Sequence, residues 1–468
     1  MKVLITGATG LVGTALGIEL SRRGHELVVV SRGRQEAIKN CPFPCEVIEA
    51  NLTEGPIESP LLNQIDGVIN LMGEPIAKGY WTDSKKQKLR DSRIRATRNL
   101  GVSFKGKSLK VLVSASAIGF YGDRGEEDIN ESSVVGNDFI SNLCQDWEQE
   151  ALALATEKTR VAITRIGLVL TRKGGLLQEL LPLFQAGAGG SIAGGRHWMS
   201  WIQLEDLVQA FVFALENPSV SGPFNAVAPS PVRNHEFTKI LSACLHRPAL
   251  LPVPKFALRL LLGEKTTIIT ASQKIVPSKL QQWGFKFHHT DLVTTLGTEL
   301  AFHSQGNEVF EAQQWVPIKP EELFPFFADP KNLEKITPDT LNFKILSVST
   351  TNVGPGTLID YTLRIRGIPV RWRTLIDDWS PPHRFVDSQL KGPYSHWQHT
   401  HQFEKLGDGT LMTDRVVYKV PLGYLGWLGG VWSVTSEVRK IFGYRRDVIA
   451  KINAASFKSK EPQLLVFE

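Results

Sequence analysis

The apolar positions of the first 300 residues fall into short runs rich in β-branched side chains, with amphipathic segments between them. The runs occupy 2–5, 26–30, 67–71, 110–114 and 161–166, and helical periodicity covers 11–23, 85–100 and 138–156. Nearly continuous apolar strands that alternate with helices are typical of a parallel sheet covered on both faces. The pattern predicts an α/β domain over 1–300, a Rossmann-type doubly wound parallel sheet, with a small substrate lobe over about 176–298.

The pattern changes near residues 301–307. Beyond them, polar and apolar positions alternate through 357–365, 370–378, 396–403 and 411–420, which predicts successive antiparallel strands joined by turns. A short helical segment begins at Pro320 before these strands, and a long one covers 436–455 after them. This order of elements is that of an α+β helix-grip domain, in which a curved sheet surrounds a helix and a cavity. We expect this domain to span 303–456.

Composition and charge narrow the class of protein. The chain has 468 residues, a formal net charge of +6 and four cysteines. So few cysteines exclude a disulfide framework, and the N-terminus carries no secretory signal, so we expect a cytoplasmic protein. The basic residues are spread along the chain, whereas a nucleic-acid partner would need a concentrated positive patch, so none is expected. The uncharged run 420–436 contains Pro421 and four glycines, so no transmembrane segment is predicted.

Three glycines lie where the first predicted strand leads into the first predicted helix. Glycines at these positions let the backbone turn tightly, approach a pyrophosphate and pack the helix closely on the strand. The N-terminus of the helix would then receive the phosphates. We therefore expect a dinucleotide to contact the residues of this turn, which are Gly7, Thr9, Gly10, Leu11, Val12 and Gly13.

The end of the second predicted strand indicates which dinucleotide is bound. An acidic residue there would hydrogen-bond the ribose hydroxyl of NAD, whereas an arginine suits the 2′-phosphate of NADP. Arg32 and Arg34 stand in this turn, and no acid follows before Glu36. The predicted cofactor is therefore NADP (NADPH), and we favour Arg32 as the residue that binds its 2′-phosphate.

Several further blocks, in order along the chain, resemble one family. They are 6–13, 70–75, 92–98, 114–122, 138–148, 165–170 and 200–206. With these blocks, residues 1–298 resemble the extended short-chain dehydrogenase/reductase superfamily, and within it the nucleoside-diphosphate-sugar epimerase family proteins. The resemblance implies that Leu71, Gly73, Arg93 and Ser114 contact the cofactor and that Arg165 faces its nicotinamide side.

The catalytic region departs from the pattern of that superfamily. Members that move a hydride use a serine or threonine, a tyrosine, and a lysine four residues beyond the tyrosine, whose charge lowers the pKa of the phenol. Ser116 occupies the serine position, but no lysine lies between Lys110 and Lys158, and Tyr80 and Tyr121 are the only tyrosines before residue 300. The usual tyrosine–lysine pair is therefore absent. We interpret Asp146 and Glu148 of the following helix as part of a solvated helical face.

Two interpretations of this region remain open. In the first, Ser116 and Tyr121 are catalytic, and the charge of the missing lysine comes from Arg93, Arg165 or Arg196. In the second, cofactor binding survives without turnover. A glycine-rich segment, 187–198, has the character of a flexible substrate loop, and Gly190, Arg196 and Trp198 are its candidate contacts to a small-molecule substrate.

The C-terminal part resembles a different superfamily. The matching stretches are 324–330, 336–338, 392–397, 399–403 and 414–418, and they resemble the polyketide-cyclase/START-like helix-grip domains. The resemblance implies an apolar ligand in a central cavity, which the aromatic residues Trp372, Trp379, Tyr394, Trp397 and Tyr418 could line. His399 and His401 would share one face of a strand next to His396, but no acid or cysteine close in sequence completes a metal site, so no metal is predicted.

Two functions from different classes fit these observations. The favoured one is an NADP-binding oxidoreductase or epimerase-like protein that acts on an unidentified small molecule, with a fused domain that binds an apolar ligand. The alternative is a regulatory protein that binds the cofactor without turnover. A link to cell division belongs to this alternative, because the resemblance extends to plastid and cyanobacterial relatives connected with that process.

Overall fold

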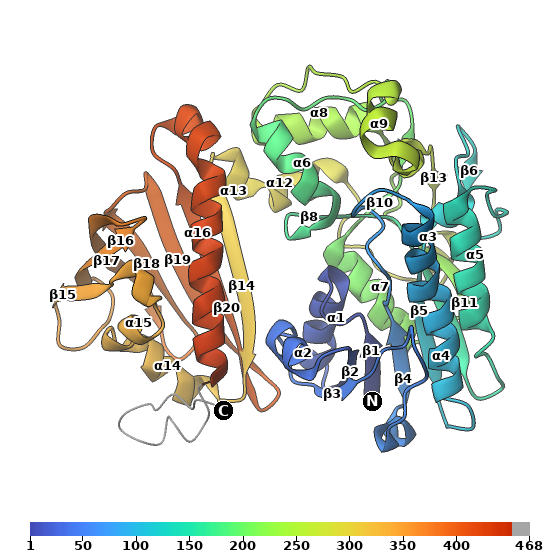
Figure 1. The fold of residues 1–468 in the computed structure, drawn as a ribbon, viewed down its shortest axis with the longest axis horizontal. Coiled ribbons are helices and arrows are strands. Elements are labelled where there is room, and N and C mark those ends of the chain that lie inside the picture. Colours follow the sequence, from blue (N-terminus) through green and yellow to red (C-terminus); the bar gives the residue numbers. More distant parts are fainter. Residues whose placement is uncertain (452–468) are drawn as a thin grey trace. The chain divides into compact units, whose positions relative to one another are not determined.

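A seven-stranded parallel sheet forms the centre of the N-terminal part. The computed structural model describes residues 1–451, and Figure 1 shows its elements. The strand order is β11-β7-β5-β4-β1-β2-β3, with all pairs parallel. The strands are β1 (Lys2–Thr6), β2 (Glu26–Ser31), β3 (Glu46–Glu49), β4 (Gly67–Asn70), β5 (Val111–Ala117), β7 (Arg160–Ile166) and β11 (Gly222–Ala226). The order reverses between β1 and β4, and ligands of such sheets bind at the carboxyl ends of the strands at that point.

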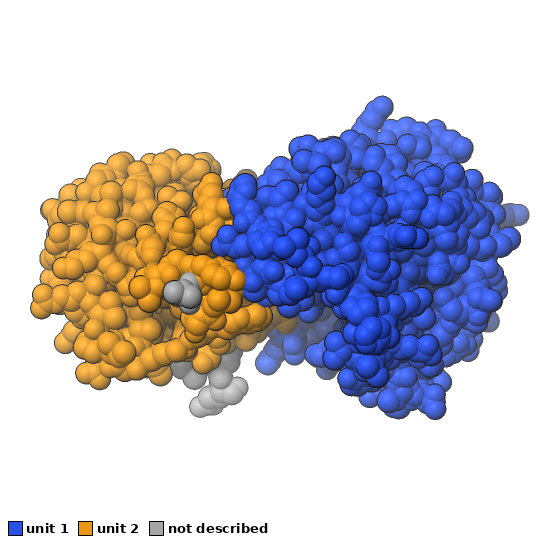
Figure 2. Space-filling view, turned by 90° about the horizontal axis from the view of Figure 1, so that it is seen from above, with its two compact units in different colours: residues 1–38, 45–301 blue, residues 39–44, 302–468 orange. Residues whose placement is uncertain are grey.

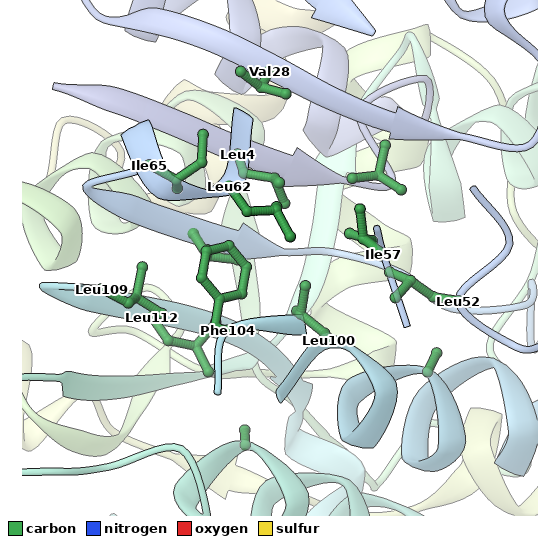
Figure 3. Close-up of a cluster of buried hydrophobic side chains, with 14 of the residues drawn as sticks. Leu4, Val28, Leu52, Ile57, Leu62, Ile65, Leu100, Phe104, Leu109 and Leu112 are labelled. Carbon is green, nitrogen blue, oxygen red and sulfur yellow. The ribbon is translucent and has the colours of Figure 1, made fainter. Parts of the chain in front are cut away.

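Helices cover this sheet. Helices α4 (Ala96–Ser103) and α5 (Phe139–Leu152) pack on one face through a core in which Leu100 and Phe104 meet Leu4, Val28 and Leu112 of the strands (Figure 3). Helices α1 (Leu11–Arg22) and α7 (Leu204–Glu216) pack against each other, and α7 also contacts β5 and β7. The alternating sequence pattern is explained by this arrangement, because strands covered on both faces have little room for polar side chains.

A smaller lobe has its own core, formed by Leu177, Phe184, Trp201, Phe237 and Leu296 with their neighbours. Its elements are β8 (Leu168–Thr171), α6 (Gly175–Gln185), β9 (Trp198–Met199), β10 (Trp201–Gln203), β12 (Val232–Arg233), α8 (Asn234–Leu245), α9 (Lys255–Leu262), α10 (Thr266–Thr270), β13 (Lys274–Ile275), α11 (Ser278–Gln282) and α12 (Leu292–Glu299). Other elements of this part are α2 (Arg34–Asn40), α3 (Asp83–Arg90), β6 (Asp128–Ile129), a π-helical turn (Asp91–Arg95) and 3-10 turns at Pro60–Gln64, Ile118–Tyr121 and Gly263–Lys265.

The C-terminal part contains a seven-stranded antiparallel sheet of order β14-β20-β19-β18-β17-β16-β15. Its strands are β14 (Glu308–Val316), β15 (Lys344–Val348), β16 (Leu358–Ile365), β17 (Ile368–Ser380), β18 (Arg384–Lys391), β19 (His396–Leu406) and β20 (Gly409–Lys419). The helices are α13 (Ala301–Ser304), α14 (Pro320–Ala328), α15 (Lys331–Lys335), a 3-10 turn at Asp339–Leu341 and the long α16 (Gly423–Lys451). Phe324, Phe385, Phe403 and Met412 form a core with Ile449 of α16. The predicted fold class, a Rossmann-type sheet followed by a helix-grip domain, is confirmed.

One detail differs from the sequence analysis. Helix α16 begins at Gly423 rather than at 436, and its first turns are held by tertiary contacts that the local pattern does not show, since Trp427 Nε1 donates to Glu308 Oε1 at 2.7 Å and Val431 is buried. The last part of the predicted helix and the expected domain end at 456 lie outside the described residues. Among the described helices, none has the length and apolar character that crossing a bilayer would require.

Contacts divide the chain into two units (Figure 2). Unit 1 consists of residues 1–38 and 45–301, and unit 2 consists of residues 39–44 with the chain from 302 onward. The two domains expected at 1–300 and 303–456 stay a prediction, which fragments of the chain can test.

Candidate functional site

The turn between β1 and α1 has the shape of a phosphate cradle. Gly7 has φ +68°, and a Cβ built on it would lie 2.7 Å from the carbonyl oxygen of Leu71. A Cβ on Gly13 would overlap the carbonyl oxygen of Gly7, so both positions require glycine. Gly10 is the N-cap of α1 and offers no side-chain cap, while Thr9 and Gly10 are exposed and Leu11 and Val12 are half-buried. The first N–H groups of α1 therefore point to an accessible place that suits an anion.

Buried hydrogen bonds tie the carboxyl ends of β1, β4 and β5 together beside this turn. Thr6 Oγ1 donates to Asn70 Oδ1 at 2.7 Å. Asn70 Nδ2 donates to Thr97 Oγ1 at 2.9 Å and to Ser114 Oγ at 3.2 Å. Ser114 is thus fully buried under the strand ends, whereas Leu71 is half-buried just beyond them. Asn70 was not singled out from the sequence, although it lies in one of the family-like blocks.

The arginines of this region have different surroundings. Arg32 is exposed at the end of β2, whereas the guanidinium of Arg34 donates to the carbonyl of Val47 at 3.0 Å. Arg93 is buried and donates to the carbonyl of Glu74 at 3.0 Å, and burial lowers its pKa. A Cβ on the exposed Gly73 would lie 2.8 Å from the guanidinium of Arg93. Arg32 is therefore placed to reach a ligand, and Arg93 supports the turn that carries Gly73.

Five buried polar side chains form a continuous hydrogen-bonded group, which we call the Arg165 network. Ser116 Oγ donates to Glu148 Oε1 at 2.6 Å. Arg165 makes two hydrogen bonds to the same carboxylate, from Nε to Oε1 at 2.9 Å and from Nη2 to Oε2 at 2.8 Å. Arg165 Nη1 also donates to the hydroxyl of Tyr121 at 2.9 Å, and that hydroxyl donates to Asn225 Oδ1 at 2.7 Å. The network thus connects β5, α5, β7 and β11.

Burial and charge fix the ionisation of this group. Tyr121 is fully buried, which raises the pKa of its phenol, although the nearby Arg165 opposes this effect. Burial alone would lower the pKa of Arg165, but its bonds to Glu148 outweigh that cost and raise it overall. The guanidinium also lies over the ring of Phe120, 3.5 Å from its centroid. Tyr121 is therefore a neutral phenol, and Arg165 forms a buried ion pair with Glu148.

Only one of the three candidate arginines places its positive charge beside the phenol of Tyr121. Among the three candidates, Arg165 contacts the phenol, whereas Arg93 bonds to Glu74 and Arg196 is exposed. The sequence interpretation of Asp146 and Glu148 as part of a solvated face is wrong for Glu148, which is buried. Asp146 agrees with that interpretation, since it is partly exposed and pairs with Arg90 at 2.7 Å.

Helix α5 presents two further side chains to Ser116. Cys144 and Glu148 stand one helical turn apart, and both lie beside the Ser116 hydroxyl. Complete burial raises the pKa of the Cys144 thiol to about 12, and the charge of Glu148 adds to this rise. The side chain charged beside Ser116 on this helix is therefore that of Glu148, and Arg165 of β7 balances its charge through two hydrogen bonds.

The residues of the candidate substrate loop 187–198 make separate contacts with other parts of unit 1. A Cβ on Gly190 would collide with the carbonyl of Leu251, so this glycine serves a close packing contact. Trp198 is half-buried, its Nε1 donates to Glu126 at 3.0 Å, and the guanidinium of Arg233 lies 4.4 Å from its ring centroid. The described contacts do not bring Gly190, Arg196 and Trp198 together with Ser116, so their role in binding a substrate stays a prediction.

Unit 2 contains a cavity of about 200 Å³. Four of the five aromatic residues expected there line it, namely Trp372, Trp379, Tyr394 and Trp397. Tyr418 does not line it, because this side chain packs beside Trp397 and its hydroxyl bonds to Thr435 Oγ1 at 2.7 Å. Tyr361 from β16 lines the cavity as well, and the sequence analysis missed it.

One wall of this cavity is polar. Asp387, His399 and His401 line it together with Arg445, and Asp414 lies behind the two imidazoles. We call these five residues the histidine cluster. The sequence analysis predicted no metal because no acid lies close to the histidines in sequence. Strand pairing nevertheless brings two acids beside them, since it places Asp387 opposite His399 and Asp414 opposite His401.

Comparisons with known families agree with the two units. Residues 3–227 match the NAD dependent epimerase/dehydratase family, and 253–298 match a domain of unknown function, DUF1731. Residues 316–431 match the polyketide cyclase/dehydrase and lipid transport family. The resemblances stated from the sequence are thereby confirmed.

Individual relatives extend this result. The chain is 36% identical over 301 residues to an epimerase family protein of Mycobacterium leprae, covering 64% of this chain and 94% of that protein. It is 38% identical over 299 residues to the chloroplastic epimerase family protein SDR39U1 homolog of Arabidopsis thaliana, covering 62% of this chain and 84% of that protein. Human epimerase family protein SDR39U1 (isoform 2), solved with NADPH, superimposes with a TM-score of 0.58 at 30% identity, covering 64% of this chain and 99% of that one. The chain therefore belongs to the epimerase family, and a polyketide cyclase/START-like domain follows its epimerase part.

Proposed function

We propose that unit 1 binds NADP(H) at the turn between β1 and α1. The observation that carries this proposal is the cradle itself, in which Gly7 and Gly13 admit no side chain and the first turn of α1 is open to an anion. The family match and the relative solved with NADPH support the same cofactor class. When bound, the nicotinamide supplies or accepts a hydride.

The residues of the site divide into contacts and supports. Gly7, Thr9, Gly10, Leu11, Val12 and Gly13 would hold the pyrophosphate, and Arg32 would pair with the 2′-phosphate. Leu71 and Gly73 would lie along the cofactor beyond β4. Ser114 and Arg93 are buried and bonded to the protein, so we assign them to the support of these loops.

Titration with NADPH and NADH tests the cofactor assignment. We expect NADPH to bind more tightly than NADH. In Arg32→Ala the ratio of the two affinities should fall by about tenfold, which is at the low end for a charge-assisted hydrogen bond because Arg32 is exposed. Arg34→Ala is the matched control. The guanidinium of Arg34 donates to the carbonyl of Val47, so this variant should leave the ratio of NADPH to NADH affinity unchanged. Equal affinity of the unmodified protein for both cofactors would overturn the assignment.

We further propose that the chain acts on a small molecule as an oxidoreductase or epimerase-like protein, with Ser116 as its proton-handling group. Ser116 lies at the carboxyl end of β5, and its Oγ donates to Glu148, which would accept a proton from it. Tyr121 has its hydroxyl bonded on both sides within the Arg165 network, so we assign it as a positioning residue that orients Arg165.

The second candidate function is a cofactor-binding regulatory protein without turnover, for which a link to cell division remains the corresponding prediction. One observation favours it: every member of the Arg165 network is buried and bonded to another member. Such a group stabilises a fold without needing a substrate.

Single-turnover oxidation of bound NADPH separates the two functions. Aldehydes, ketones and nucleotide sugars would be offered in turn, with fluorescence of the nicotinamide as the readout. If the chain is an enzyme, at least one compound should oxidise the bound NADPH. The rate of this oxidation should fall about a hundredfold in Ser116→Ala and stay unchanged in Ser132→Ala, where the serine is exposed. Tightly bound NADPH that no compound oxidises would favour the regulatory function.

We propose that unit 2 binds an apolar small molecule in its aromatic cavity. The lining by Trp372, Tyr394 and Trp397 supports this, as does the match to a family whose name includes lipid transport. Native mass spectrometry of the purified full chain would test it, because a retained ligand would add its mass to the protein. A Trp397→Ala variant should lose that mass while keeping NADPH binding.

A further inference from the structure

The histidine cluster has the composition of a metal centre. His399 and His401 lie two residues apart on β19 and therefore share one face of the sheet. Asp387 of β18 pairs with His399 on that face, and all three side chains line the cavity of unit 2. Two imidazoles and a carboxylate are ligands that zinc and other divalent first-row transition metals prefer.

The distances between the ligand atoms suit a small divalent ion. Asp387 Oδ2 lies 3.1 Å from His401 Nε2 and 3.7 Å from His399 Nδ1. Ligands about 2.0–2.2 Å from a tetrahedral zinc ion are roughly 3.3–3.6 Å apart, so the two distances bracket that range. One ligand atom from each of the three residues lies within 4.8 Å of the others. A metal ion could thus be bound with small movements of the side chains.

The opposite edges of the two imidazoles are held by a second carboxylate. Asp414 Oδ1 lies 3.0 Å from His399 Nε2 and 2.9 Å from His401 Nδ1. Histidines that bind a metal commonly donate their other ring N–H to a carboxylate, which orients the ring and raises its basicity. Arg445 Nη2 lies 3.6 Å from the same oxygen and partly balances its charge. Asp414 is therefore in the place that an orienting carboxylate would occupy.

The hydrogen bonds within the cluster leave one ring nitrogen facing a carboxylate without a proton between them. His399 Nε2 pairs with Asp414 at 3.0 Å, His401 Nε2 pairs with Asp387 at 3.1 Å, and Arg445 Nη2 donates to His401 Nδ1 at 3.3 Å. Two neutral imidazoles carry only two N–H groups, so His399 Nδ1 presents a lone pair to Asp387 Oδ2, 3.7 Å away. A cation bound between these two atoms would turn that repulsion into coordination. The rings of Phe385 and Phe442 pack on the imidazoles and limit hydration of this place.

We propose that Asp387, His399 and His401 bind a divalent first-row transition metal of the zinc type, with its open coordination position facing the cavity. Three protein ligands leave at least one position for an exogenous donor. Since the remaining walls are aromatic, the ligand class that fits is an apolar molecule with an anionic oxygen, such as a phenolate, enolate or carboxylate. This site extends the proposed apolar-ligand function of unit 2 and does not depend on cofactor binding in unit 1.

Metal uptake by the full-length protein tests the proposal directly. The protein would be treated with a chelator, equilibrated with Co²⁺ and followed by visible absorption, and its Zn²⁺ content after equilibration would be measured by mass spectrometry. We expect stoichiometric binding of Co²⁺ with the intense bands of a four- or five-coordinate site, and its displacement by Zn²⁺. Absence of both metals from folded protein at micromolar metal concentration would overturn the proposal.

Matched variants locate the site. His399→Gln and Asp387→Asn should weaken binding at least about a hundredfold, and Asp414→Asn should weaken it about 10–100-fold, the usual effect of removing a carboxylate that orients a ligand. His396→Ala is the control, because this histidine lies exposed on the same strand. NADPH binding and the circular dichroism spectrum would show that each variant is folded. Equal Co²⁺ affinity in the unmodified protein, His399→Gln and Asp387→Asn would also overturn the proposal, because the metal would then bind elsewhere.

Discussion

The Arg165 network of unit 1 and the histidine cluster of unit 2 are both groups of five polar side chains, all of them buried except the half-buried Asp387. In the Arg165 network the two hydroxyls and the guanidinium donate within the group, and the carboxylate is matched by the guanidinium in two hydrogen bonds. In the histidine cluster two carboxylates face four ring nitrogens, and four of the five members line a cavity. The balance of donors and acceptors and the access to a cavity therefore distinguish the two groups.

This difference separates a group that holds a fold together from a group that holds a ligand. In a network whose side chains are bonded to one another, removing one member leaves its partners buried and unpaired, so the network stabilises the fold whether or not Ser116 also handles a proton. In a cluster that lines a cavity and has a ring nitrogen facing a carboxylate, binding of a cation would relieve the repulsion between them.

The largest effect should come from removing the charge at the centre of the Arg165 network. Glu148→Gln keeps the size of the side chain but leaves the buried guanidinium of Arg165 without its carboxylate. We expect a loss of about 3–5 kcal/mol in the free energy of unfolding, because breaking a buried ion pair leaves an uncompensated charge. Urea unfolding followed by far-ultraviolet circular dichroism would measure it.

Glu150→Gln on the same helix is the matched control. Glu150 pairs with the exposed Arg98, and surface ion pairs of this kind contribute little to stability. The control should therefore unfold near the urea concentration of the unmodified protein. If Glu148→Gln were as stable as this control, the Arg165 network would not be the structural group that we describe.

A smaller effect should follow from removing one hydroxyl of the network. Tyr121→Phe deletes the group that accepts from Arg165 and donates to Asn225, and both partners remain buried. We expect a loss of about 1–3 kcal/mol in the free energy of unfolding, the usual cost of an unsatisfied buried polar group. Tyr80→Phe, at an exposed tyrosine, should leave stability unchanged.

The same variant sharpens the assignment of Tyr121 as a positioning residue. A phenol used as the acid or base would make the rate of NADPH oxidation fall steeply in Tyr121→Phe and change its dependence on pH. A positioning phenol predicts a modest fall in rate with an unaltered pH profile. Single-turnover rates across a range of pH, normalised to the folded fraction, distinguish these outcomes.

The features of the fold that depend on local sequence pattern could be predicted from the sequence. Alternating apolar runs predicted both sheets, and the spacing of Gly7, Gly10 and Gly13 predicted the phosphate cradle, because close backbone contacts there exclude a side chain. The start of α16 was placed too late, since its glycines have low helix propensity and the contacts of Trp427 and Val431 in its first turns depend on the tertiary structure.

The two polar groups could not be predicted in this way. Ser116 and Glu148 are separated by 32 residues, and they meet because α5 returns across the end of β5. Asp387 meets His399 through the register of β18 and β19, which the intervening turn determines and the residue types alone do not reveal. Burial of Glu148 follows from the face of α5 that also carries Leu143, Cys144 and Trp147, and this amphipathic pattern was the available signal.

The smallest effect is expected from dividing the chain, and it tests whether the two groups belong to independent units. All residues assigned to NADP(H) binding, and all five members of the Arg165 network, lie before residue 300. A fragment of residues 1–300 should therefore bind NADPH with the affinity of the full chain, measured by titration calorimetry. The Arg32→Ala effect should also be the same in both proteins, because the 2′-phosphate contact needs no residue of unit 2. A fragment that is folded by circular dichroism but binds NADPH at least tenfold more weakly would show that residues beyond 300 complete the site, and the two groups could no longer be treated as separate.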